Sequence, residues 1–175
     1  MTRSVIIFRH GKSDWVADHN HDRERPLSRR GAQAARAMGR LLAASGMVPQ
    51  RALCSPALRV ATTVDLAIIA GDWVCERETC EGLYLGGAEA MLDELRGLPD
   101  TLEHVLLAGH ETSCSETVGR LVGGGDVRIP TAAMACVEFD LEHWRHLSWG
   151  DGQLVWLVPP RLLLGGPEPW GNGGS

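Results

Sequence analysis

Two short apolar runs, each ending in glycine and histidine, restrict the fold of this chain more than any other feature. The first occupies residues 4–9 and leads into "RHG", and the second lies within "HVLLAGHE" at residues 104–111. Short, continuous apolar runs of this kind are typical of strands that are buried on both faces of a parallel sheet. The sequence therefore predicts a sheet protein whose strands end abruptly in polar, chemically versatile residues.

Helical patterns alternate with these strand patterns. From Ser28 to Gly46, small and apolar residues recur at helical spacing, and a second helix is predicted from Ser55 as N-cap, with Pro56 in its first turn, to Gly71. Strands alternating with helices indicate an α/β sandwich, mostly parallel, with a later β meander at one edge. The remaining predicted helices are "GAEAMLDELRGL" (87–98) and "SETVGRLVG" (115–123), and the remaining predicted strands are 52–54, "WVCERE" (73–78), the stretch ending in "CVEFDL" (141), "WRHLSW" (144–149) and "GQLVWLVPP" (152–160).

Length and composition limit the kind of protein. A chain of 175 residues with 44% hydrophobic content is most economically one domain, which we assign to residues 1–164, followed by a Gly/Pro-rich tail, 165–175, expected to be disordered. Its 17 Lys+Arg against 22 Asp+Glu give a net charge of -5. Without a basic run, nucleic acid and membrane surfaces are not expected partners.

The cysteines and the N-terminus indicate a location. Five cysteines, an odd number with no C-x-x-C pair, argue against a disulfide framework and a zinc knuckle. The apolar run near the N-terminus is too short for a signal peptide, and no stretch is long enough to span a membrane. We therefore expect a cytoplasmic protein.

Four residues at strand ends form the candidate site. In open α/β sheets, ligands bind beyond the carboxyl ends of the strands, and this topology brings Arg9, His10, Arg59 and His110 toward one rim. Two guanidinium groups and two imidazoles around one point suit a dianionic phosphoryl group. A helix N-terminus beside Arg59 adds to this attraction, and Gly11 would let backbone N–H groups approach an oxyanion.

Two other kinds of site are less well supported. "GKS" at residues 11–13 is the tail of a P-loop, but that motif needs glycine at position 6, where this chain has Ile6. "HNH" at 19–21 and "EHWRH" at 142–146 lack further ligands at metal-binding spacing. We expect neither a metal nor another cofactor.

Five ordered blocks resemble the histidine phosphatase superfamily, the phosphoglycerate mutase-like clan. They are "RHG" (9–11), "RPLSRRG" (25–31), "SPALRVATT" (55–63), "EGLY" (81–84) and "GHE" (109–111). Together with "GKSDW" and the short length, they are most similar to the SixA-type phosphohistidine phosphatase branch. The resemblance, which extends from residue 5 to about residue 158, implies a three-layer α/β/α sandwich with a mostly parallel central sheet.

The resemblance also implies roles for the site residues. His10 would be the nucleophile, phosphorylated transiently, and Arg9, Arg59 and His110 would hold the phosphoryl oxygens. Neighbouring arginines would keep the His10 imidazole unprotonated, as attack on phosphorus requires. Proton transfer to the leaving group is assigned to a carboxylate, with Glu81 preferred over Glu111. At the mouth of the site we expect Ser13 to donate a hydrogen bond to the phosphate, with Lys12, Asp14 and Trp15 lining the mouth beside it.

The predicted function follows from these assignments. No segment is long enough to form a lid domain, so we expect a shallow, open site that suits a phosphorylated protein side chain. The prediction is a metal-independent phosphatase that removes phosphate from phosphohistidine in a protein and releases inorganic phosphate. Two alternatives stay open. One is a broad phosphomonoesterase, or a mutase, acting on small phosphate esters. The other is a phosphate- or phosphoprotein-binding module without turnover.

Overall fold

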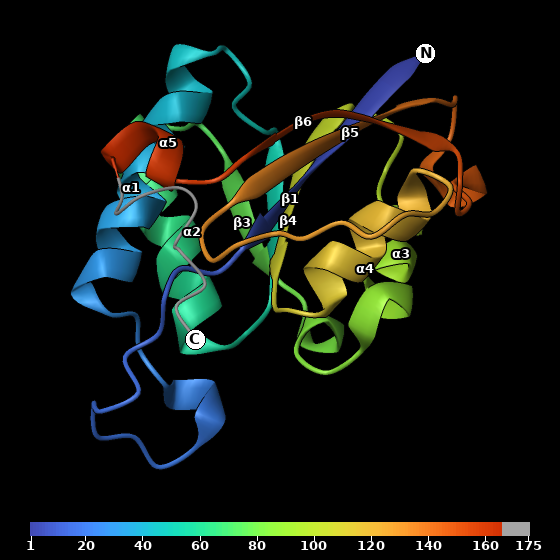
Figure 1. Cartoon of the computed structure of the whole chain (residues 1–175). Helices are drawn as coiled ribbons and strands as arrows, with labels where there is room; N and C mark the ends of the chain where they lie inside the picture. The colour runs from blue at the N-terminus through green and yellow to red at the C-terminus, as the bar shows by residue number, and fades with distance from the viewer. Residues whose placement is uncertain (166–175) are drawn as a thin grey trace, which may run out of the picture.

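A computed structural model describes residues 1–165 of the chain, in which one six-stranded sheet lies between two layers of helices (Figure 1). The strands are β1 (Thr2–Arg9), β2 (Arg51–Cys54), β3 (Glu76–Thr79), β4 (His104–Gly109), β5 (Met134–Asp140) and β6 (Gly152–Val158). The helices are α1 (Arg29–Ala44), α2 (Leu58–Gly71), α3 (Gly87–Arg96), α4 (Ser113–Leu121) and α5 (Arg161–Leu164), with single 3₁₀ turns at Asp22–Glu24, Glu81–Leu83 and Trp144–His146.

The strand order brings distant segments together. It is β3-β2-β4-β1-β5-β6, with parallel pairing from β3 to β1 and antiparallel pairing of β5 with both β1 and β6. The mostly parallel sheet with an antiparallel edge is therefore confirmed. Because β4 lies between β2 and β1, with Arg9 opposite Gly109 in the register, both predicted histidine-bearing strand ends are neighbours at the same edge of the sheet.

Each face of the sheet is covered by its own pair of helices, α1 and α2 on one face and α3 and α4 on the other (Figure 1). Val5 and Ile7 point into the core beneath α3 and α4, whereas Ile6 and Phe8 point into the core beneath α1 and α2. Successive strand residues face opposite sides, so a strand covered on both sides must be apolar throughout. The three-layer α/β/α fold is thus confirmed.

Two predicted elements differ from the structure. Ser55 is not the N-cap of α2, which begins at Leu58 after Ala57. The Ser55 hydroxyl lies 2.9 Å from a ring nitrogen of His110 and accepts from the Ala57 N–H at 3.4 Å. "WRHLSW" is not a strand. Trp144 starts a 3₁₀ turn. Its indole N–H donates to the Leu102 carbonyl at 2.7 Å and its backbone N–H donates to Asp100 at 3.0 Å, and these two hydrogen bonds hold the turn in place.

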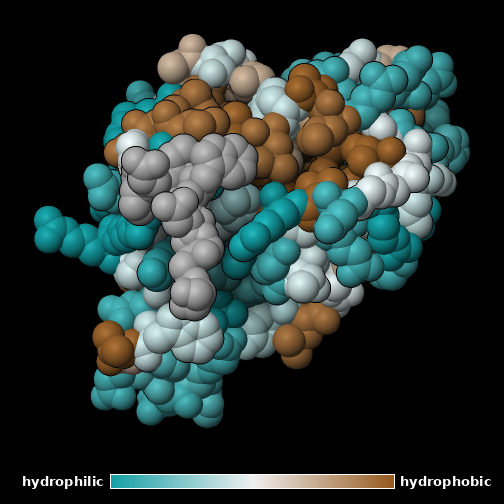
Figure 2. All heavy atoms as spheres, viewed as in Figure 1, coloured by the Kyte–Doolittle hydropathy of each residue, from teal (hydrophilic) through white to brown (hydrophobic). Residues whose placement is uncertain are grey.

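The hydropathy of the surface differs between two parts of the molecule. Figure 2 shows a largely hydrophilic surface over the loop between β1 and α1, and hydrophobic side chains gathered over β6 and α5. The exposed hydrophobic residues of these two elements are Leu154, Val155, Leu162, Leu163 and Leu164. The predicted tail falls mainly on residues 166–175, which lie outside the described residues.

A close backbone approach between α1 and α2 yields a first test of the fold. A Cβ on Gly39 would lie 2.2 Å from the Ala67 carbonyl oxygen, a separation that real side chains do not adopt. We expect Gly39→Ala to lower the free energy of unfolding by about 1–3 kcal/mol, the usual cost of overpacking, as measured by urea denaturation. Gly97→Ala is the matched control, because its nearest neighbour would be the Asp93 carbonyl oxygen at 3.5 Å. Equal effects of the two substitutions would contradict the helix packing described here.

Candidate active site

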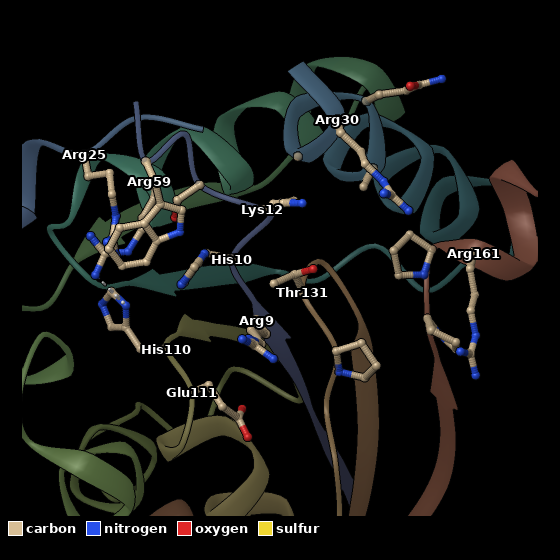
Figure 3. Close-up of a pocket in the computed structure, with 18 of the residues that line it drawn as sticks. Arg9, His10, Lys12, Arg25, Arg30, Arg59, His110, Glu111, Thr131 and Arg161 are labelled. Atoms are coloured by element: carbon tan, nitrogen blue, oxygen red, sulfur yellow. Dashed lines mark hydrogen bonds between the residues drawn. The ribbon is translucent and has the colours of Figure 1, made fainter. Parts of the chain in front are cut away.

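The four residues predicted to form the site do meet in space. Arg9, His10, Arg59 and His110 all line one cavity of about 1090 Å³ at the carboxyl ends of β1 and β4 (Figure 3). The two imidazole rings lie edge to face, with centroids 5.4 Å apart. His110 also packs against the Tyr84 ring at 5.7 Å. The sheet thus assembles from distant segments a cluster that no single stretch of sequence contains.

His10 is held in one tautomer. Its Nδ1 lies 2.7 Å from the Gly11 carbonyl oxygen, and because a carbonyl can only accept, Nδ1 carries the proton. Burial, together with the positive charges of Arg59, Arg9 and Arg25, lowers the pKa of His10 to about 4 against the opposing effect of the Gly11 hydrogen bond. At neutral pH the ring is therefore uncharged, and Nε2 has a free lone pair.

His110 is fixed by two partners. Its Nδ1 lies 3.3 Å from Nη2 of Arg59, and because a guanidinium only donates, this nitrogen is unprotonated and Nε2–H donates to the Ser55 hydroxyl at 2.9 Å. Burial, followed by the charges of Arg59 and His10, lowers the pKa of His110 to about 4. Both histidines are therefore neutral at pH 7. His10 carries its proton on Nδ1, whereas His110 carries its proton on Nε2.

A third arginine completes the cationic cluster. Arg25 is 6% exposed, and its guanidinium stacks on the Trp15 ring at 3.5 Å from the centroid. Arg59 is similarly buried, while Arg9 is anchored by donating from Nη1 to the Ile129 carbonyl at 2.8 Å. Arg25 belongs to "RPLS", which follows a polar loop without helical or strand periodicity. The sequence pattern therefore predicts no role for Arg25.

Asp22, from the same loop, is the counter-ion that sequence analysis overlooked. Its carboxylate accepts from Nη2 of Arg59 at 3.0 Å and from the Tyr84 hydroxyl at 3.1 Å, and it forms an ion pair with Arg25 at 3.1 Å. Partial burial acts to raise the pKa of Asp22, but the hydrogen bonds from Arg59 and Tyr84 and the nearby positive charges hold it below its usual range. Asp22 therefore stays ionised at neutral pH.

Glu81, the preferred candidate for the acid, lies outside the cavity lining. Its side chain is 70% exposed, and its carboxylate accepts from both terminal nitrogens of Arg23, at 2.7 and 3.0 Å. Glu111 does line the cavity, but one of its oxygens accepts from the Ser115 hydroxyl at 2.5 Å. Figure 3 shows its carboxylate pointing away from the His10 ring. The structure therefore does not bring Glu81 to the reaction centre.

Four further predicted positions lie in the loop after β1. Lys12, Ser13 and Trp15 line the cavity, whereas Asp14 does not, because its carboxylate accepts from the backbone N–H groups of the next turn. Gly11 has a packing role instead of the predicted phosphate contact. Its N–H donates to the Thr63 hydroxyl at 3.0 Å, and a Cβ there would lie 2.8 Å from the carbonyl oxygen of Gly31.

The cavity is larger than we expected for the shallow, open site predicted from the chain length. After β6 the chain turns through Pro159 and Pro160 into α5, which contacts α1 and adds to the wall of the cavity. The cavity consequently extends from the histidines to Arg161. The sequence predicts a strand that ends in "VPP" and indicates no role in the site for the residues that follow.

Three broader expectations concern the described residues as a whole. Within residues 1–165, no group of three or more His, Cys, Asp or Glu residues is arranged to hold a metal ion. All five cysteines are free thiols. Over the same residues, no helix combines the length and apolar character needed to cross a membrane.

The lowered histidine pKa values yield a second test. By NMR titration, we expect the His10 and His110 rings to protonate near pH 4, and Arg59→Gln to raise the His110 midpoint because it removes a neighbouring positive charge. Arg36→Gln, on the exposed face of α1, is the control and should shift neither midpoint. A wild-type midpoint near 6.5 for either ring would contradict the burial described here.

The same pKa values predict how stability depends on pH. Both rings have a pKa of about 4 in the fold, below the ordinary imidazole value of 6.5, so the unfolded chain binds more protons between these two pH values. Stability contributed by the neutral rings is complete above about pH 6.5 and is lost as the pH falls toward 4.

Comparisons with known proteins agree with this geometry. The family described as "Histidine phosphatase superfamily (branch 1)" matches residues 5–84. An uncharacterized protein of Mycobacterium tuberculosis (strain ATCC 25618 / H37Rv) is 30% identical over 167 residues, which cover 88% of this chain and 100% of the relative.

Two solved structures share the fold across nearly the whole chain. The protein histidine phosphatase SixA complexed with tungstate has a TM-score of 0.79 at 26% identity, covering 91% of this chain and 99% of the other. A SixA-type protein from Nakamurella multipartitia has the same TM-score at 23% identity, covering 91% and 97%. The chain therefore belongs to the histidine phosphatase superfamily, and its fold is similar to that of SixA-type members.

Proposed function

We propose that this phosphatase acts through a phosphohistidine intermediate on His10 and that its substrate is phosphohistidine in a protein. The observation that carries the proposal is the neutral His10 ring, whose Nδ1–H is anchored on the Gly11 carbonyl. Its unprotonated Nε2 lies within a cluster of three arginines that also line the cavity. A nucleophile held beside donors for the phosphoryl oxygens is what this chemistry requires.

In the first step, Nε2 of His10 attacks phosphorus. The N–P bond forms while the bond to the leaving group breaks, and its electron pair leaves with that group. Charge spreads over the equatorial phosphoryl oxygens during transfer, where the guanidinium groups of Arg9, Arg25 and Arg59 can stabilise it. Because Nδ1 keeps its proton, the phosphorylated ring is cationic, and the Gly11 carbonyl stabilises that charge.

In the second step, water attacks the phosphorylated ring. An O–P bond forms, the N–P bond breaks, and the electron pair returns to Nε2, which restores the neutral imidazole. The proton from water passes to solvent or to the phosphate product. A cationic phosphoimidazole is a good phosphoryl donor, since it releases a neutral ring. Inorganic phosphate is the product of the cycle.

The scarcity of proton donors in the cavity favours phosphohistidine over alkyl phosphates. The described lining contains two carboxylates, Asp22 and Glu111. Asp22 is kept ionised by Arg59 and Arg25, and Glu111 is bonded to Ser115 and points away from His10. An alkoxide leaving group needs an acid, whereas a phosphohistidine that is protonated on its other ring nitrogen releases neutral imidazole without one. We accordingly propose that neither Glu81 nor Glu111 acts as the general acid.

Two further observations support parts of the proposal. The SixA structure in the comparison holds tungstate, a tetrahedral oxyanion of the same shape as phosphate.

Five free cysteines fit a reducing compartment, so we propose a cytoplasmic location. Burial raises the pKa of the Cys54 thiol to about 12, which makes this thiol unreactive at neutral pH.

The central test is a search for the intermediate. The protein is incubated, in the presence of chelator, with a phosphohistidine-bearing domain or with an aryl phosphate, then quenched and analysed for acid-labile phosphate on the chain. We expect a phosphoenzyme in wild type and none in His10→Ala. Arg59→Gln should slow its formation by about 10²–10³-fold, the usual cost of losing one oxyanion donor, and Arg36→Gln should not.

Three results would count against the proposed function. Phosphate binding without a phosphoenzyme from either substrate would favour the binding-module alternative. Loss of activity in chelator would contradict the metal-independent mechanism. Faster turnover of simple aryl phosphates than of the phosphohistidine domain would favour a broad phosphomonoesterase.

The proposed lack of a general acid has its own test. Values of kcat/KM should decline steeply from phosphohistidine through aryl phosphate to alkyl phosphate, because the leaving group becomes progressively poorer. Glu81→Gln and Glu111→Gln should leave the aryl-to-alkyl ratio unchanged. If either variant selectively slows hydrolysis of the alkyl phosphate, that glutamate is the acid, and this part of the mechanism is wrong.

A further inference from the structure

The cavity is much larger than a phosphoryl group needs. Its volume of about 1090 Å³ lies just above the range of about 300–1,000 Å³ for sites that hold whole small molecules. The reacting groups described above occupy one end of this space. Figure 3 shows that the cavity continues past Thr131 to Arg30 on α1 and Arg161 on α5.

The far end is cationic. Arg30 and Arg161 lie on the opposite side of Thr131 from His110, and Lys12 extends from the loop after β1 toward the same region (Figure 3). None of the three forms a salt bridge with an acidic residue of the described chain, 1–165. Both carboxylates of the described lining are at the other end, where Asp22 pairs with Arg59 and Glu111 follows His110.

This charge distribution is unusual for an acidic chain. The protein has a net charge of -5, yet its described cavity lining contains six cationic side chains and two carboxylates. A phosphoryl dianion bound beside His10 would be neutralised by Arg9, Arg25 and Arg59, leaving the charges at the far end uncompensated. A local positive potential of this kind attracts and orients an anionic group.

Apolar surface lies among these cations. Ala34, Pro130, Pro160 and Leu164 line the cavity beside Arg30 and Arg161. Such a wall can pack against the uncharged part of a substrate. The cavity thus suits an elongated ligand with a phosphoryl group at one end, an apolar middle and an anion at the other.

We propose, building on the proposed phosphatase function, that the substrate carries a second anionic group and that Lys12, Arg30 and Arg161 bind it. Arginine forks match both carboxylate and phosphate oxygens, so the shared chemistry is an oxyanion displaced from the reacting phosphoryl group. It is supplied either by an acidic side chain near a phosphohistidine or by a second phosphate on a small molecule.

Binding of inert analogues tests the subsite separately from turnover. Calorimetry compares linear alkane bisphosphonates of increasing chain length with alkyl monophosphonates of the same lengths. At the length that spans the cavity, we expect the bisphosphonate to bind about tenfold more tightly, since hydrogen bonds between charged groups contribute at this level. This preference should fall toward one in Arg30→Gln/Arg161→Gln and, by a smaller factor, in Lys12→Gln.

Arg36→Gln is the matched control, because it removes the same charge from an exposed position of α1 outside the cavity. It should keep the full preference, and circular dichroism confirms that each variant is folded. Equal affinity of wild type for the two ligand types at every length would overturn the proposal. So would a preference that survives in the double variant.

Two substrate series distinguish the sources of the second anion. One compares phosphohistidine peptides with and without flanking acidic residues, and the other compares small aryl phosphates with and without a second phosphate. A gain in kcat/KM in either series that disappears in Arg30→Gln/Arg161→Gln supports the subsite and identifies its source. Phosphoenzyme formation without any bisphosphonate preference would refute the subsite alone. A bisphosphonate preference without a phosphoenzyme would instead refute the proposed turnover.

Discussion

The parallel pairing of β1 with β4 is the constraint on which the site depends. With Arg9 opposite Gly109 in the register, the residues that follow the two strands, His10 and His110, leave the sheet at the same edge with their rings 5.4 Å apart. A shift of one residue would turn the side chains of either strand to the opposite face. The two helical layers prevent such a shift, because Val5 and Ile7 fill one core while Ile6 and Phe8 fill the other. Catalytic geometry is therefore a consequence of hydrophobic burial several residues away.

Electrostatics in the cluster work in two directions. Burial does most to make imidazolium formation unfavourable at His10, and the arginines that would hold a phosphoryl dianion act in the same direction. The same charges need a counter-ion before substrate arrives, and Asp22 provides it through Arg59 and Arg25. Partial neutralisation of this kind lowers the repulsion among buried guanidinium groups. It also holds Arg59 in place, since the guanidinium is bound through both the side chain and the backbone carbonyl of Asp22.

The features predictable from sequence are those with a periodic or repeated signal. Apolar runs predicted β1 and β4, helical spacing predicted α1, and strand ends predicted the meeting of His10 with His110. Residues on irregular segments were not predictable in the same way. Asp22 and Arg25 reach the cavity through the path of a polar loop, and Glu81 turns outward because Arg23 binds it. The packing role of Gly11 could not be predicted from the "RHG" motif, because it depends on a contact with Gly31, which is distant in sequence.

In the proposed function, the two ends of the cavity would recognise different parts of a substrate. The end around His10 would bind any phosphoryl group through arginines that contact only its oxygens, so it discriminates mainly through the leaving group. Lacking a poised acid, it would select substrates whose leaving group departs without help, but it would not distinguish one phosphohistidine from another. Discrimination between such substrates must come from contacts beyond the phosphoryl group, and Arg30 of α1 and Arg161 of α5 would provide them at the cationic far end. Since α5 follows the last strand and takes no part in the sheet, this end can differ between related proteins while the chemistry beside His10 stays the same.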